Sequence, residues 1–145
     1  MIVQSMRLKN IKSYGEGPNG EGVTIFFEPG ANRIAGKNGH GKTTLIESLG
    51  YALFLTGPVF EEGFQFETYF LRAGQKAAEI DVTFNHRGEL YRVERGLGPV
   101  TKRKTKVVQV DDGSTCAEGD KEVSAFLCRL FGLPNPRRFS ELFWS

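Results

Sequence analysis

The sequence has few cysteines, no long apolar run and almost no net charge. Its two cysteines, Cys116 and Cys128, fit neither a disulfide framework nor a metal-ligand pattern. They predict two free thiols in a reducing compartment. No window is long and apolar enough to span a bilayer, and the first residues lack a signal-peptide pattern. These absences favour a soluble, cytoplasmic protein without a membrane partner.

The charge balance also says little about a nucleic-acid partner. The formal net charge is only +2, so a partner that needs positive charge must find it in local clusters. What the chain does have is a 39% apolar share with twelve phenylalanines, which is enough for a core. Its 145 residues suit one domain or slightly less. Because residues 137–145, RRFSELFWS, are rich in apolar side chains without a terminating signal, we expect a fragment.

Alternation of apolar and polar residues predicts strands in the first quarter of the chain. In residues 2–11, Met6 and Leu8 lie on one face and basic side chains on the other. A glycine-rich turn leads to a second predicted strand at residues 23–27. A short extended piece at residues 33–36 then enters the most glycine-rich part of the chain.

The rest of the chain predicts helices around a β-meander. Residues 42–55 have apolar side chains at helical spacing, and the helix is apolar over much of its surface, with Gly57 and Pro58 just beyond it. Three alternating segments predict an antiparallel meander with one face toward water, namely residues 77–84, 89–95 and 106–110. A second helix is predicted over residues 120–133, with Asp120 as cap and Gly132 as stop. Asn135 and Pro136 predict the start of another helix.

Residues 36–44 read GKNGHGKTT and contain the motif with the clearest chemistry. Gly36, four further residues, and then Gly41, Lys42 and Thr43 form the P-loop pattern G-x-x-x-x-G-K-[ST]. A loop around a triphosphate must point consecutive backbone N–H groups at the phosphate oxygens, and a Cβ on its inner side would keep them away. The glycines therefore predict that the main chain itself is the ligand.

The side chains of the motif have separate expected roles. Lys42 would contact the β- and γ-phosphates, the Thr43 hydroxyl is the expected Mg²⁺ ligand, and Thr44 would hydrogen-bond the α-phosphate. The helix that begins within the motif would direct its dipole at the phosphates. His40 would contribute its backbone, with the imidazole toward solvent. The predicted nucleotide-binding set is Gly36, Lys37, Asn38, Gly39, His40, Gly41, Lys42, Thr43 and Thr44.

Residues 8–54 together resemble the N-terminal half of the ATPase heads of the SMC, SbcC and RecF group. The resemblance rests on the turn N-I-K-S-Y at residues 10–14 and on the run from Gly30 to Thr43. YFLRAGQKAAEIDVTF and GELYRVERG also resemble the SbcC-type continuation, so the likeness covers most of the chain. It implies an α/β P-loop NTPase fold, the N-terminal lobe of an ABC-type head with a mixed or antiparallel sheet.

This resemblance further implies site residues and partners. Lys12 and Ser13 lie where the family's opening turn approaches the phosphates, and Arg72 where some relatives place an arginine that reaches the nucleotide. The implied activity is ATP hydrolysis with Mg²⁺ in DNA repair or chromosome maintenance, in the nucleoid-associated cytoplasm. The implied partners are the C-terminal half of its own head, a second head and sequence-independent DNA, with a nuclease subunit left open.

The resemblance implies that the family's later motifs would follow downstream of residue 145. Its Q-loop, coiled coil, signature motif and Walker B acids are absent from residues 1–145, which we expect to form the N-terminal lobe of a split head. Because phosphoryl transfer depends on the positioning and charge that those acids supply, we expect this piece alone to be inactive. His40 also departs from the small residue that most of the family has.

A basic cluster in the meander has two interpretations. Four basic residues lie within five positions, namely Lys102, Arg103, Lys104 and Lys106. They form either a solvated loop between strands or a set of sequence-independent contacts with duplex phosphates. No aromatic residue interleaves them, which argues against stacking on single strands.

Other functions remain open at this point. A nucleotide-dependent switch or tethering module without hydrolysis would use the same loop. A small-molecule or nucleotide kinase would need an arginine-rich lid and an acceptor site, and neither is found in the sequence. A GTPase would need an Asn-Lys-x-Asp motif, which is also absent.

Overall fold

The structure, a computed structural model, describes residues 1–27, 39–55 and 69–138, and for residues 39–43 the backbone alone. The elements in chain order are β1 (Ile2–Lys9), β2 (Val23–Phe26), α1 (Gly39–Phe54), β3 (Ala78–His86), β4 (Glu89–Leu97), β5 (Lys106–Gln109), β6 (Thr115–Glu118) and α3 (Asp120–Phe131). No helix in these ranges is both long and apolar enough to cross a membrane.

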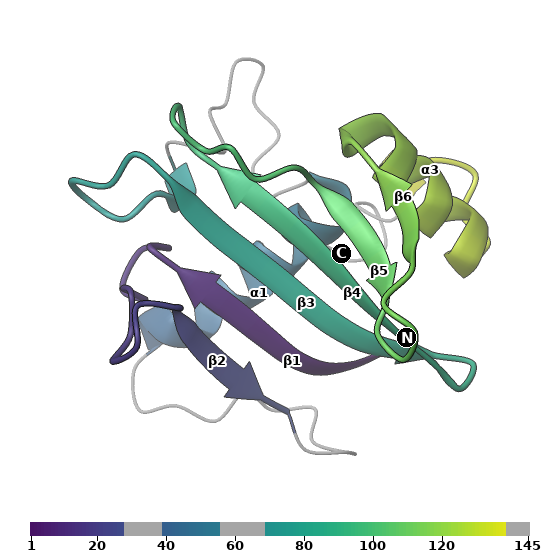
Figure 1. Cartoon of the computed structure of the whole chain (residues 1–145), viewed down its shortest axis with the longest axis horizontal. Helices are drawn as coiled ribbons and strands as arrows, with labels where there is room; N and C mark the ends of the chain where they lie inside the picture. Colours follow the sequence, from purple (N-terminus) through teal and green to yellow (C-terminus); the bar gives the residue numbers. More distant parts are fainter. Residues whose placement is uncertain (28–38, 56–68, 139–145) are drawn as a thin grey trace.

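The strands form one twisted sheet in the order β2-β1-β3-β4-β5-β6, and every neighbouring pair is antiparallel (Figure 1). The five strands predicted at residues 2–11, 23–27, 77–84, 89–95 and 106–110 are confirmed within a few residues. The further extended piece predicted at residues 33–36 lies outside the described residues. β6 was not predicted, because its four residues TCAE offer no apolar alternation.

The inner face of the sheet carries the core. The side chains of β3 that point inward, Ala78, Ile80, Val82 and Phe84, are at most 1% exposed. Helix α1 packs on β3 and β4, and α3 packs on β5 and β6, with Val123 and Leu127 fully buried (Figure 1). The core is therefore one apolar layer between the sheet and these helices.

Helix α1 confirms the helix predicted at residues 42–55 and begins three residues earlier, at Gly39. Leu45, Ala52 and Leu53 are buried as their spacing predicts, whereas Ile46 is 44% exposed. The helix ends at Phe54, and Leu55 turns the chain with a positive φ of 55°. Gly57 and Pro58, predicted to end it, lie outside the described residues.

The two ends of α3 give one confirmed prediction and one wrong one. Gly132 takes the left-handed conformation at φ 69° and donates its N–H to the carbonyls of Arg129 and Cys128, as a helix stop should. Asp120 does not cap the helix: the N-cap is Gly119, without a side-chain cap bond. The Asp120 carboxylate instead accepts a hydrogen bond from Arg95 at 2.9 Å.

The predicted start of another helix at Asn135 is confirmed. A helical turn begins at Pro136, and the Asn135 side-chain oxygen accepts the backbone N–H of Arg138 at 3.0 Å.

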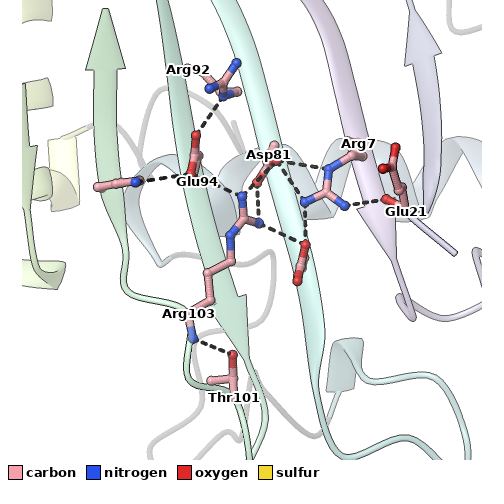
Figure 2. Close-up of polar contacts among 9 residues, drawn as sticks. Arg7, Glu21, Asp81, Arg92, Glu94, Thr101 and Arg103 are labelled. Atoms are coloured by element: carbon pink, nitrogen blue, oxygen red, sulfur yellow. Dashed lines mark hydrogen bonds and ion pairs between the residues drawn. The ribbon is translucent and has the colours of Figure 1, made fainter. Parts of the chain in front are cut away.

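The outer face of the sheet carries an ionic network rather than a simply solvated layer (Figure 2). Arg7, Asp81, Glu94 and Lys106 lie directly opposite one another on β1, β3, β4 and β5. The neighbouring acids Asp81 and Glu94 would repel each other, and they are only 7% and 9% exposed. Arg103 separates them, with Nη1 2.6 Å from Asp81 and Nη2 3.2 Å from Glu94.

Candidate nucleotide-binding site

The start of α1 is the centre of the candidate site. α1 begins at Gly39, within the glycine-rich motif. The first backbone N–H groups of a helix have no partner inside it, and the helix dipole adds about half a positive charge at that end. The main chain here is therefore suited to an anion such as a phosphate. Of the predicted set, residues 36–38 lie outside the described residues.

The side chains of the motif are placed only in part. Those of Gly39 to Thr43 lie outside the described residues, so the roles predicted for Lys42 and Thr43 stay predictions. Thr44 follows them in α1 and is 6% exposed. Its predicted contact with the α-phosphate likewise stays a prediction.

A second segment, the opening turn of residues 10–15, follows β1. Ile11 and Tyr14 exchange backbone hydrogen bonds at 2.9 and 2.8 Å, and Ile11 is fully buried beneath the turn. Asn10 and Lys12 both take positive φ values, 59° and 47°, which non-glycine residues adopt only where the surroundings hold them. Ser13 is exposed at its tip.

Residues 70–72 hold the opening turn in this conformation. The N–H of Lys12 donates to the Phe70 carbonyl at 3.0 Å, and the N–H of Arg72 donates to the Asn10 carbonyl at 2.9 Å. The Arg72 guanidinium adds a bond from Nη1 to the Lys12 carbonyl at 2.9 Å. The structure thus brings together Lys12, Ser13 and Arg72, although 60 residues separate Lys12 from Arg72.

Tyr69 connects the opening turn to α1. The Lys12 ammonium lies 3.4 Å from the centre of the Tyr69 ring, within the range of a cation–π interaction. The Tyr69 hydroxyl lies 2.7 and 2.9 Å from the two carboxylate oxygens of Glu47 in α1. Burial and the bond to Glu47 raise the pKa of Tyr69 to about 12, so its hydroxyl remains a donor at neutral pH.

The far end of α1 is fixed by Arg95 of β4. This side chain is 1% exposed among apolar neighbours, and it donates from Nε to the Ala52 carbonyl at 2.8 Å and from Nη2 to the Leu53 carbonyl at 3.4 Å. The last carbonyls of a helix lack partners inside it, so Arg95 serves as a C-terminal cap from another element. Asp120 accepts a further bond and balances the buried charge.

The basic cluster does not form one uniform surface. Lys102 and Lys104 are exposed, and Lys104 lies 3.7 Å from Glu118. Arg103 belongs to the ionic network, where it contacts Glu79, Asp81 and Glu94. Lys106 is 3.9 Å from Glu94. Three of the four basic residues therefore lie within 4 Å of an acid of the sheet, although Lys104 remains exposed.

Tyr69, Glu47 and Arg95 were not singled out from the sequence. A carboxylate within an otherwise apolar helix was the available signal for Glu47, because a buried acid needs a donor. A charged residue on the apolar face of a strand was the signal for Arg95. Nothing local identified Tyr69, since its partners are 22 and 57 positions away.

Comparison with known proteins places the chain in a family. A family model described as "AAA domain" matches residues 5–136. The DNA double-strand break repair Rad50 ATPase of Thermoplasma volcanium is 26% identical over 132 residues, which cover 88% of this chain and 13% of the relative. The chromosome partition protein Smc of Mycolicibacterium paratuberculosis is 26% identical over 135 residues, covering 90% of this chain and 10% of the relative. The chain thus spans a small part of these relatives' length.

The fold has a counterpart among solved structures. The recombination mediator protein RecF in its ATPrS form matches with a TM-score of 0.59 and 15% identity, over 84% of this chain and 29% of that one. The resemblance stated from the sequence and the P-loop ATPase fold are both confirmed. The chain belongs to the AAA domain family and is similar to the Rad50, Smc and RecF proteins.

Proposed function

We propose that residues 1–145 are the ATP-binding, N-terminal lobe of a split ABC-type ATPase head. The observation that carries this proposal is that α1 begins at Gly39, inside a complete P-loop motif, in a chain that the family model matches from residue 5 to residue 136. A helix that starts within GKNGHGKTT directs its positive dipole, and amides without a partner inside the helix, toward its N-terminal end. A polyphosphate is the ligand that suits this combination.

In this proposal the chain supplies the phosphate cradle and part of the metal site. Lys42 contacts the β- and γ-phosphates, and the Thr43 hydroxyl would hold Mg²⁺. When bound, Mg²⁺ neutralises charge on the phosphate oxygens. The amides at the start of α1, which have no partner inside the helix, suit the phosphates that carry such an ion. The remaining acids come from the C-terminal half of the head, so hydrolysis needs that half and a second head.

In this proposal the opening turn lines the nucleotide site together with the start of α1. We place Lys12 and Ser13 toward the phosphates and Arg72 behind them. The three lie in one unit, and Arg72 supports the Lys12 backbone through its bond to the Lys12 carbonyl. Ser13 is exposed at the tip of the turn, as a ligand contact requires.

The names of the relatives support a proposal for the cellular role. Their printed names describe double-strand break repair, replication and repair, and chromosome partition. We propose that the complete protein acts in DNA repair or chromosome maintenance in the nucleoid-associated cytoplasm and binds DNA without sequence preference. A nuclease subunit is a further proposed partner. Lys102 and Lys104 are the basic residues of the cluster that are exposed enough to contact phosphates.

The experiment is ATP turnover by the full-length protein and by its Lys42→Ala variant. We expect hydrolysis by the full-length protein and a loss of about 100-fold or more in the variant, because positioned charge dominates phosphoryl transfer. If the full-length protein binds nucleotide but shows no hydrolysis that the Lys42→Ala change removes, the result would instead support the switch or tethering module. Failure of the full-length protein to bind ATP at all would overturn the proposal. A kinase is disfavoured, because the described sheet is antiparallel throughout.

A further inference from the structure

We infer that Tyr69 is a positioning residue that holds the Lys12 ammonium beside α1 for contact with the nucleotide's phosphates. The inference rests on the proposed function and adds a residue that neither the P-loop motif nor the opening turn contains. Its basis is two contacts made by Tyr69. The Lys12 ammonium lies 3.4 Å from the centre of the Tyr69 ring, and the Tyr69 hydroxyl lies 2.7 and 2.9 Å from the two carboxylate oxygens of Glu47.

The contact between Tyr69 and Glu47 is rigid. Glu47 is 6% exposed and lies in α1, one helical turn after Thr43. A buried carboxylate needs a donor, and the Tyr69 hydroxyl supplies it. The Tyr69 ring also packs nearly perpendicular to the ring of the fully buried Phe70, with ring centres 5.1 Å apart. Because Tyr69 is held at its hydroxyl and by this contact, its ring stays fixed relative to α1.

The Lys12 ammonium is held without loss of charge. Among the described residues no carboxylate lies within ion-pair distance of the Lys12 ammonium, whereas Lys104 and Lys106 each lie near a glutamate. A cation–π contact restrains an ammonium while leaving its positive charge uncompensated. An ammonium held in this way pays less ordering entropy when an anionic ligand arrives.

The backbone adds to this placement. Lys12 has a positive φ of 47°, and its N–H and carbonyl are both bonded to the segment that carries Tyr69, through Phe70 and Arg72. Backbone and side chain of Lys12 are thus set by one short segment, residues 69–72. Tyr69 need not touch the nucleotide for this effect, since it acts through Lys12.

The test is a double-mutant cycle in the full-length protein, read as the affinity for Mg·ATP and as KM and kcat. Tyr69→Leu removes ring and hydroxyl, Tyr69→Phe keeps the ring, and Tyr69→Trp offers a larger ring. Lys12→Met removes the ammonium and keeps a long apolar stem. We expect Tyr69→Leu to weaken Mg·ATP binding by roughly two- to thirtyfold, the range of a cation–π contact, and Tyr69→Trp to restore part of it. Tyr69→Phe should have a smaller effect, and KM should change more than kcat.

The decisive comparison is made in the Lys12→Met background. There Tyr69→Leu should change the affinity by less than about twofold, because the ammonium that it positions is gone. An equal loss in both backgrounds would overturn the inference and assign Tyr69 a purely structural role. Thermal unfolding of each variant separates this outcome from misfolding. If Tyr69→Leu does not fold, the same comparison is made with Tyr69→Phe, whose smaller loss of affinity should likewise disappear in the Lys12→Met background. Lys42→Ala tests the proposed function separately: if it leaves binding intact, the site itself is wrong, whatever Tyr69 does.

Discussion

The Arg95 guanidinium donates a hydrogen bond from Nε to the carbonyl oxygen of Ala52 at 2.8 Å and so joins the middle of the sheet to the last turn of α1. Arg95 points inward between Val93 and Leu97 of β4, both fully buried. The charge is placed in the core because the end of a helix there needs donors for its carbonyls. The helix whose other end begins the P-loop site is thereby fixed along its axis.

We predict that Arg95→Met lowers the free energy of unfolding by about 3 kcal/mol, because the buried Ala52 and Leu53 carbonyls lose their donor. Urea unfolding measures this. Asp120→Asn is the matched control, since Asp120 pairs with the same guanidinium but its side chain is 64% exposed. We expect it to cost less than about 1 kcal/mol. An equal cost for both variants would mean that the ion pair, rather than the helix cap, is what matters.

The ionic network predicts a loss of stability in acid. Burial alone would raise the pKa of Glu94, but hydrogen bonding from Arg92 and the charges of Arg103 and Lys106 lower it overall. A carboxyl with a lowered pKa in the folded state stabilises the protein above its unfolded value, about 4.3, and loses this contribution as the pH falls through the folded value. We therefore expect the urea concentration at the unfolding midpoint to decrease as the pH is lowered from 5 to about 3. Glu94→Gln should lower the midpoint at pH 6 and reduce its dependence on pH; an unchanged pH dependence would exclude Glu94 as a source.

The same network separates the basic residues by function. Lys102→Gln combined with Lys104→Gln should leave unfolding unchanged, because both side chains are exposed. In the full-length protein it should reduce the salt slope of duplex DNA binding by about 1 to 2. Arg103→Gln should instead destabilise the fold, because Asp81 and Glu94 would face each other across β3 and β4. A DNA salt slope unaffected by the double lysine variant would remove the cluster from the DNA-binding surface.

Gly98, in the turn after β4, offers a test of a close backbone contact with Lys76. It has a φ of 99°, and a Cβ at this position would lie 2.3 Å from the Lys76 carbonyl oxygen. Gly98→Ala should therefore cost well above the roughly 1 kcal/mol expected from the left-handed conformation alone. Gly113→Ala is the control: its φ is 73° and an added Cβ meets nothing within 4 Å. Thermal unfolding compares them, and similar losses would show that the close approach to Lys76 is unimportant.

Periodicity predicted the framework because the sheet has one apolar face and its alternation is local. The pattern of residues 77–84 specified the inward row of β3, and the spacing of residues 42–55 specified α1. The short, polar β6 lacked such a pattern and takes its conformation from pairing with β5. Local pattern thus succeeds where burial is periodic and fails where a neighbouring strand decides.

Charged residues were harder to assign, since their partners are distant in sequence. Asp120 has the residue type of a helix cap, but Arg95 occupies its carboxylate, so the local rule failed. Arg103 has the sequence context of a loop cation, yet it is set between two acids of neighbouring strands. Family resemblance placed Lys12 and Arg72 each near the nucleotide, but the hydrogen bond between them was not predicted, because nothing in their own segments indicates the contact.

The most direct test of the account is the affinity of the full-length protein for Mg·ATP, measured calorimetrically for wild type, Lys42→Ala and Lys37→Ala. Both variants remove one positive charge from the same loop, so a general charge effect would weaken both alike. The account predicts that Lys42→Ala weakens binding by about tenfold or more and that Lys37→Ala weakens it by less than about threefold. Equal losses in the two variants, or wild-type protein that does not bind Mg·ATP, would contradict a phosphate site at the start of α1.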